Sequence, residues 1–189
     1  MRVVDRACAT ADMLKDILSG VSGEDVGALI EELVRAKEAS AKIYFFAAGR
    51  ANLVMRTFAM RIMQIGLRAH VVLDTITPAM EEGDLLIVAS GSGKTKSVQL
   101  IVDEAHELGA RVALFTKDAS SHMASCADCM IVVPSRTEGM KLQTKGSEFE
   151  QALFILCDSI GVELCFRLGE IDSIDQIDRF IYRLHANLQ

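Results

Sequence analysis

The chain has 189 residues, 50% of them hydrophobic, and carries a formal net charge of −6, so one well-buried domain is expected rather than two. The acidic balance argues against a surface for nucleic acid or for an anionic membrane. No apolar run reaches the roughly 18 residues that span a bilayer, and the charged start MRVVDRACATAD lacks the apolar stretch of a signal peptide, so a cytoplasmic protein is expected.

Two helical segments are expected first, at about residues 3–18 and 24–39. The second segment repeats apolar side chains at helical spacing and carries Glu and Arg on its other face. Its apolar positions are Val26, Leu29, Ile30, Leu33 and Val34. We expect these N-terminal helices to pack against a neighbouring subunit.

The pattern then changes to short apolar runs that do not alternate with polar residues. These runs are KIYFFAAG, AHVVLD, DLLIVAS, RVALFT and DCMIVV. Helix-length segments separate most of them, at about 52–66 and 97–108, and further helices are expected at about 147–168 and 174–184. Such runs indicate strands buried on both faces, hence a parallel sheet with helices on either side. We therefore predict a doubly wound, three-layer α/β sandwich.

The run DLLIVAS leads into VASGSGKTKS, residues 88–97, which is similar to the phosphate loop of nucleotide-binding proteins. That loop reads G-x-x-x-x-G-K-[ST]. Counting back from Gly93 places Val88, a residue of the incoming strand, where the first glycine belongs. The sequence therefore argues against a nucleotide triphosphatase.

The same loop still has the features of a phosphate site that needs no metal ion. Ser90, Ser92 and Thr95 offer hydroxyl donors, and Gly91 and Gly93 let the backbone approach a ligand closely. The following helix would add free N–H groups and the positive end of its dipole. A loop that only caps a helix is the alternative. Ligands of open α/β sheets bind at the carboxyl ends of strands, however, and this position favours phosphate binding.

The run KIYFFAAG ends in a similar way. Gly49 permits a turn, and Arg50 supplies a fixed cation with a fork of donors. Two strand ends of this kind can form one pocket, so both residues are candidate contacts for the rest of the ligand.

The five cysteines are an odd number for a disulfide framework, and we expect them to be reduced, buried thiols. Cys126 and Cys129 have C-x-x-C spacing, but only His122 lies near them in sequence as a further zinc ligand. No metal site is expected.

Four longer segments carry a more specific signal: AAGRANLVMRTFAMRIMQIG, TITPAMEEGDLLIVASGSGKTKSV, GSEFEQALFILCD and the terminal HANLQ. Together they resemble the 6-phospho-3-hexuloisomerase family of sugar isomerase (SIS) domain proteins. The resemblance implies one SIS domain over residues 1–189, with N-terminal helices (1–40), an α/β core (41–170) and a C-terminal helix and tail (171–189). It also implies a five-stranded parallel sheet and a homotetramer with active sites at subunit boundaries. The implied reaction interconverts D-arabino-3-hexulose 6-phosphate and fructose 6-phosphate without a cofactor.

The resemblance also implies roles for individual residues. Ser90, Ser92 and Thr95, with the amides of residues 91–94, would hold the phosphate. Glu150 matches the family's glutamate, the base that moves a proton between two carbons through an enediol, and Ser147 is expected as the N-cap of its helix. His185 matches the family's histidine and would reach a neighbouring subunit's site. The electrostatics of helix ends favour a carboxylate and a histidine at such positions without any catalytic role, and this structural alternative remains open for both.

Three departures from the family pattern concern the pocket. The family's GRSG reads GRAN here, so Ala51 replaces a serine and Asn52 offers a different donor to the sugar. The family's Q-P-M-G-[ST]-x-F-E reads QTKGSEFE at residues 143–150, which introduces Lys145, and the chain ends in Gln189 rather than glutamate. A non-catalytic phosphosugar sensor is therefore the alternative to an isomerase, and retention of Glu150 favours the isomerase because a sensor needs no base.

Overall fold

The computed structural model describes residues 2–135 and 141–187. Its centre is a five-stranded sheet in which all neighbouring strands are parallel, in the order β2-β1-β3-β4-β5. The strands are β1 (Lys42–Ala47), β2 (Arg68–Val71), β3 (Leu85–Ser90), β4 (Arg111–Thr116) and β5 (Cys129–Val132). Every residue of β1 and β3 is buried, as runs without alternation predict for central parallel strands. The predicted α/β fold is confirmed.

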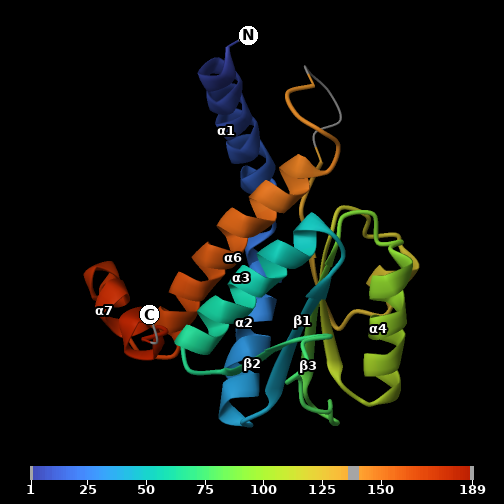
Figure 1. Ribbon diagram of the computed structural model, residues 1–189, viewed down its shortest axis with the longest axis vertical. Coiled ribbons are helices and arrows are strands. Elements are labelled where there is room, and N and C mark those ends of the chain that lie inside the picture. The colour runs from blue at the N-terminus through green and yellow to red at the C-terminus, as the bar shows by residue number, and fades with distance from the viewer. Residues whose placement is uncertain (1, 136–140, 188–189) are drawn as a thin grey trace.

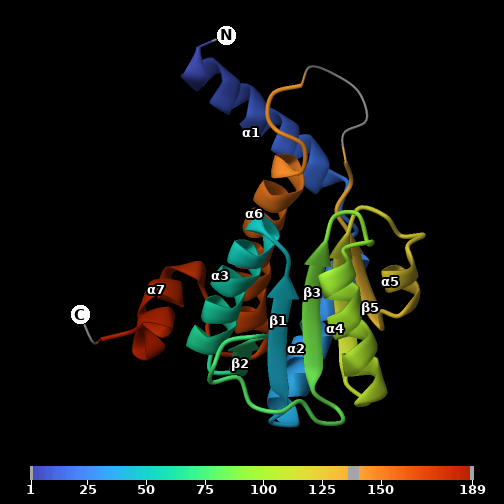
Figure 2. The same cartoon turned by 45° about the vertical axis from the view of Figure 1, so that its right-hand side comes forward.

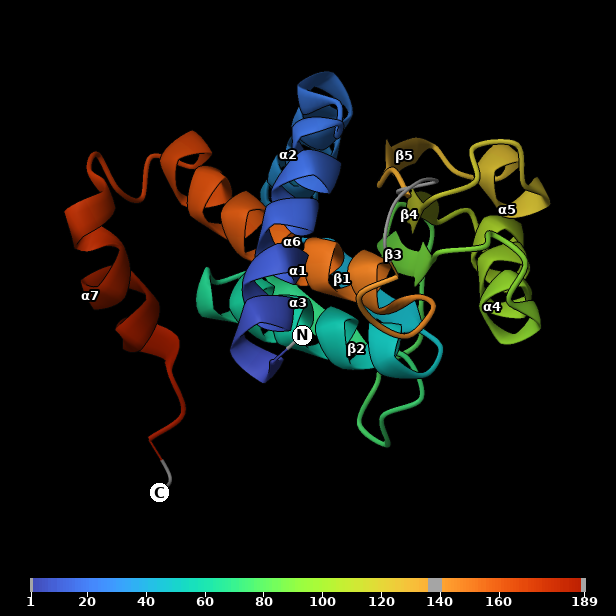
Figure 3. The same cartoon turned by 90° about the horizontal axis from the view of Figure 1, so that it is seen from above.

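Helices cover both faces of this sheet (Figure 1, Figure 3). The helices on one face are α1 (Val3–Ser19), α2 (Gly23–Glu38), α3 (Arg50–Gln64) and α6 (Ser147–Arg167), and those on the other are α4 (Lys96–Glu107) and α5 (His122–Ser125). Successive residues of a strand contact opposite layers. Phe45 of β1 packs with the first group of helices, and Tyr44 and Phe46 pack with the second.

The strand order creates a crevice at one edge of the sheet. From β1 the chain moves outward to β2, and it then returns to place β3 on the other side of β1. The loops after β1 and β3 therefore leave the sheet in opposite directions. The crevice between two such loops is where ligands of open α/β sheets bind. The arrowheads of β1 and β3 and the start of α6 lie at the same end of the molecule (Figure 2).

The N-terminal helices differ from each other in their packing. Leu29 and Leu33 of α2 are fully buried and belong to this chain's own core. In α1 the buried residues are Met13, Leu14 and Ile17, all in its second half. Its first half extends beyond the body of the domain (Figure 1). The prediction of packing against a neighbouring subunit therefore applies to α1 rather than to α2, and it stays a prediction.

Some expected boundaries were wrong. The helix expected at 174–184 is broken into α7 (Ile177–Ile181) and two flanking 3-10 turns, Ile174–Gln176 and Tyr182–Leu184. The helix expected from residue 52 begins at Arg50, and α5 was not expected, because a single turn has no apolar repeat to detect. The boundaries proposed within residues 1–189 stay a prediction. No helix in the described part of the chain has the length and apolar character to span a membrane.

Candidate active site

The loop after β3 is built around an internal pair of hydroxyls. Ser90, the last residue of β3, is buried, and its Oγ lies 2.9 Å from the Oγ1 of Thr95. Thr95 is the N-cap of α4, but its side chain makes no capping hydrogen bond to the helix. The first N–H groups of a helix lack partners within the helix, so the start of α4 presents free donors beside these hydroxyls. The exposed Ser92 accepts a hydrogen bond from the Lys94 N–H at 3.2 Å.

Two glycines of this loop are required by its surroundings. Gly93 has φ +61°, and a Cβ there would lie 2.1 Å from Ser121 Oγ. A Cβ on Gly91 would lie 3.3 Å from both Lys117 Cε and Phe149 Cδ1. The loop thus lies against the residues that follow β4 and against Phe149 in the first turn of α6.

The loop after β1 supplies a glycine turn and an arginine. Gly49 has φ 60° and ψ −135°, a conformation that favours glycine, and is the N-cap of α3. Arg50 begins α3, and its guanidinium reaches the start of α6, with Nη1 donating to Ser147 Oγ at 3.2 Å. Asn52 closes the end of β1, since its Oδ1 accepts from the Ala47 N–H at 3.1 Å. Its amide NH2 is the group that remains to donate to a ligand.

The start of α6 differs from expectation in one respect. The N-cap is Gly146, with φ 93°, rather than Ser147. Ser147 is the first helical residue and is buried, and its hydroxyl bonds Thr144 Oγ1 at 2.8 Å as well as Arg50. A left-handed residue before the helix is easily made by glycine, which explains why the cap falls one position earlier. The Ser147 hydroxyl therefore links the start of α6 to Arg50 of α3 and to Thr144, instead of capping α6.

Glu150 lies in the first turn of α6, and its side chain is 19% exposed. Its Oε2 lies 3.1 Å from Arg50 Nε, but the atom is buried and has no partner of hydrogen-bond geometry among the described residues. We interpret the contact as an ion pair that leaves an acceptor lone pair free. The carboxylate thus lies between the Arg50 guanidinium and the positive end of the α6 dipole.

A hollow of about 720 Å³ adjoins this ion pair and is lined by Arg50, Glu150, Gln143, Gln151 and apolar residues of α1 and α6. Gln143 donates to Gln151 across it at 2.7 Å. Among the described residues, those of the loop after β3 do not line the hollow. The hollow therefore reaches Arg50 and Glu150 from the side of α1.

His185 lies apart from these three segments. Its ring stacks on Tyr182, with centroids 5.2 Å apart, and it lines a separate hollow with Arg61 and Asp158. Asp158 follows Glu150 by about two turns of α6, or about 12 Å along the helix axis, and the C-terminal segment lies at the opposite end of α6 from Glu150 (Figure 1). One chain therefore does not bring the two expected catalytic residues together. The prediction that His185 serves a neighbouring subunit stays a prediction.

The structure adds Lys117, which the sequence pattern did not single out. It follows β4, lies against Gly91, and places its Nζ 3.7 Å from Glu148 Oε1. The sequence feature that could have identified Lys117 is its position directly after the end of a strand. Lys94 extends away from the loop and pairs with Asp118 at 3.2 Å.

The cysteines are less uniform than expected. The Cys129, Cys157 and Cys165 thiols are buried, but Cys8 is exposed and Cys126 is half-buried. Burial raises the pKa of the Cys129 thiol to about 11, which disfavours a thiolate. The expectation of five buried thiols was wrong because Cys8 lies on the protruding part of α1 and Cys126 directly follows the one-turn helix α5.

Comparison with known proteins supplies independent findings. The chain matches the SIS domain family over residues 37–154. A Mycobacterium gastri protein named 3-hexulose-6-phosphate isomerase is 35% identical over 183 residues, which cover 94% of this chain and 87% of that protein. A Methanococcus jannaschii crystal structure, for which a molecular function of 3-hexulose-6-phosphate isomerase was inferred, has a TM-score of 0.78 and 28% identity over 98% of both chains. The Vibrio vulnificus NanR protein complexed with ManNAc-6P has a TM-score of 0.74 and 25% identity over 98% of this chain and 71% of its own.

Proposed function

This chain belongs to the SIS domain family, in the group that includes the 3-hexulose-6-phosphate isomerases, and on that premise we propose that it is a phosphosugar isomerase. The finer proposal is that it interconverts D-arabino-3-hexulose 6-phosphate and fructose 6-phosphate. One observation carries it: Glu150, whose side chain is 19% exposed, lies in the first turn of α6, and Phe149 of the same turn lies against Gly91 of the loop after β3.

The phosphate group fits the loop after β3. Its oxygens would accept hydrogen bonds from Ser92, Thr95 and the free N–H groups at the start of α4. The dipole of α4 favours a dianion at this point. These contacts bind and orient the sugar and form no covalent bond, so their contribution is to hold the reacting carbons against the base.

The proton transfer is assigned to Glu150. Starting from the 3-ketose, its carboxylate would remove the proton from carbon 2, and the electron pair would form the carbon 2–carbon 3 double bond of an enediol. A proton moves from the oxygen on carbon 2 to the oxygen on carbon 3. Glu150 then returns its proton to carbon 3, leaving the carbonyl at carbon 2. One carboxylate performs both steps because it serves as base and then as acid.

Arg50 is proposed to position this carboxylate. Its guanidinium holds Ser147 at 3.2 Å and Glu150 at 3.1 Å, both in the first turn of α6. The arginine thereby fixes the direction of the carboxylate before the sugar arrives. Gly49 allows the turn that places Arg50 there, and the Asn52 amide is the donor proposed for a sugar hydroxyl.

Replacing Ser92 with alanine is expected to weaken binding of phosphorylated sugars about tenfold or more, because a hydrogen bond to a charged group contributes about 1.5–3 kcal/mol. The affinity for fructose 6-phosphate is measured by calorimetry. Ser159→Ala is the matched control, since this exposed serine on α6 bonds only its own helix, at Ile155 O. An unchanged affinity in Ser92→Ala would place the phosphate elsewhere.

A homotetramer with shared active sites is proposed as well. The first half of α1 exposes Val3 and Val4, and Phe154 and Ile155 on α6 are also exposed, so an apolar surface is available to a second subunit. His185 of one subunit would then complete the Glu150 site of another and move the proton between the two sugar oxygens.

Mixing inactive subunits tests the sharing. Refolded mixtures of Glu150→Gln and His185→Ala chains are expected to regain activity that neither variant shows alone. A mixture of two differently tagged Glu150→Gln chains is the control. No recovery in hybrids whose composition is verified would rule out the shared site.

The proposed function itself is tested by a coupled assay that detects fructose 6-phosphate formed from the 3-ketose phosphate. NanR with bound ManNAc-6P has this fold, and that complex favours the sensor as the second candidate. Saturable binding of phosphosugars without turnover on any of them would support the sensor.

A further inference from the structure

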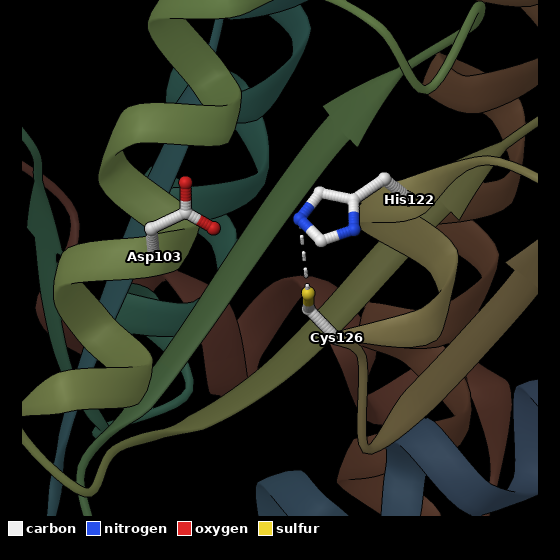
Figure 4. Close-up of side chains that lie close together, drawn as sticks. All are labelled: Asp103, His122 and Cys126. Carbon is white, nitrogen blue, oxygen red and sulfur yellow. Dashed lines mark hydrogen bonds between the residues drawn. The ribbon is translucent and has the colours of Figure 1, made fainter.

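Three side chains meet on the outer face of the helices that cover the second side of the sheet (Figure 4). Asp103 comes from α4, His122 begins α5, and Cys126 follows the end of α5. One carboxylate oxygen, one imidazole nitrogen and the Cys126 sulfur all lie within 4.8 Å of one another. We infer that Asp103, His122 and Cys126 form a binding site for a thiophilic divalent cation, with Zn²⁺ as the ion that fits best.

The geometry is close to that of a bound zinc ion. Zinc binds sulfur at about 2.3 Å and histidine nitrogen at about 2.0–2.1 Å, and a tetrahedral angle between them places the two ligand atoms about 3.6 Å apart. His122 Nε2 and Cys126 Sγ are 3.9 Å apart. The pair is separated by four residues across one helical turn, so both side chains project from the same face. A few tenths of an ångström of side-chain movement brings this pair to the zinc spacing, and the Asp103 carboxylate, within 4.8 Å of both, must move closer to bind the same ion.

The ligand types point to zinc rather than to a hard cation. Magnesium and calcium prefer sites made only of oxygen ligands, whereas a mixture of sulfur, nitrogen and oxygen suits Zn²⁺. Asp103 and His122 are exposed and Cys126 is half-buried, so an ion reaches the cluster directly from solvent. With three protein ligands, a water molecule fills the fourth position.

The surroundings hold the ligands in place before the ion arrives. Gln99 donates to Asp103 Oδ1 at 2.6 Å, which orients the carboxylate and leaves its second oxygen for the metal. The backbone that carries His122 is anchored on both sides: Ser121 caps α5 through the Ala124 N–H, and Met123 is fully buried. Metal binding would therefore join α5 to α4 without rearranging either helix.

Cobalt and zinc titrations of the reduced, chelator-treated protein test the site without an activity assay. One equivalent of Co²⁺ is expected to give the strong visible bands of a four-coordinate ion and a thiolate charge-transfer band. Loss of an outer partner of a ligand costs about 10–100-fold in metal affinity. Cys126→Ser and His122→Ala should therefore lose at least that much in competition with a chromophoric chelator. Gln99→Ala should lose only about 10–100-fold in metal affinity, because Gln99 orients Asp103 and does not itself bind the ion.

Cys8→Ser is the matched control, because Cys8 is an exposed thiol on a different helix. Its zinc affinity should equal that of the parent protein. Zinc at about one hundred times its dissociation constant should raise the Tm of the parent chain by about 5–10 °C, and Cys126→Ser should lose this shift. A cobalt spectrum without the thiolate band, or equal losses in Cys8→Ser and Cys126→Ser, would overturn the inference.

Discussion

Glu150→Gln is expected to lower kcat about 10²–10⁴-fold, the contribution typical of a positioned general base, while the affinity for phosphosugars changes little. Glutamine has nearly the same shape and still reaches Arg50, but it cannot accept a proton from carbon. The two constants are measured separately, kcat in the coupled assay and the dissociation constant by calorimetry.

Glu148→Gln is the matched control for this variant. Glu148 lies in the same helical turn and is 20% exposed, against 19% for Glu150, but it pairs with Lys117 rather than Arg50. We expect its kcat to stay within about threefold of the parent value, because Glu148 takes no part in the proposed proton transfer and the large loss belongs to removal of the base itself. Equal losses in the two variants would mean that any charge change at the start of α6 disturbs the site, and the base assignment would fall.

Gly93→Ala is expected to reduce the free energy of unfolding by about 2–5 kcal/mol and to abolish phosphosugar binding. The backbone there has φ +61°, and the new Cβ would lie 2.1 Å from Ser121 Oγ and 2.4 Å from Ser121 Cβ. Since Ser121 is buried and caps α5, it cannot yield cheaply, and the phosphate loop must move instead. Denaturant unfolding gives the stability, and calorimetry gives the binding.

Gly83→Ala separates backbone strain from the collision. Gly83 has φ +84°, and a Cβ added there would meet nothing within 4 Å, so only the cost of a left-handed alanine applies, about 1–2 kcal/mol. This variant should bind phosphosugars normally. If Gly83→Ala and Gly93→Ala lose equal stability, the contact with Ser121 does not constrain the loop.

The sheet was predictable because its central strands are buried on both faces. A segment such as DLLIVAS has no reason to be continuously apolar outside a covered parallel sheet, and every residue of β3 is buried. The position of the glycine- and hydroxyl-rich loop at the end of β3 was predictable for the same reason, since it directly follows that strand, and its binding of phosphate stays a prediction. The broken C-terminal helix was not predictable, because the apolar spacing of residues 174–184 fits a continuous helix and its interruptions depend on contacts across the fold.

The contacts that organise the candidate site join residues far apart in sequence. Arg50 and Ser147 are 97 positions apart, and no local pattern in either segment indicates that they meet. The same holds for Asp103, which comes beside His122 and Cys126 only because α4 and α5 lie on the same face of the sheet. Motifs thus indicated which segments are candidates for the site, while tertiary packing determined which side chains pair.

The most direct test of the proposed reaction is proton exchange at carbon. The protein is incubated with fructose 6-phosphate in deuterium oxide, and the sugar is examined by NMR. Transfer through a carbon 2–carbon 3 enediol predicts that deuterium appears at carbon 3 and that Glu150→Gln stops its appearance. Deuterium at carbon 1 instead would indicate an aldose–ketose isomerase, and saturable binding with no exchange at any carbon would contradict the catalytic account altogether.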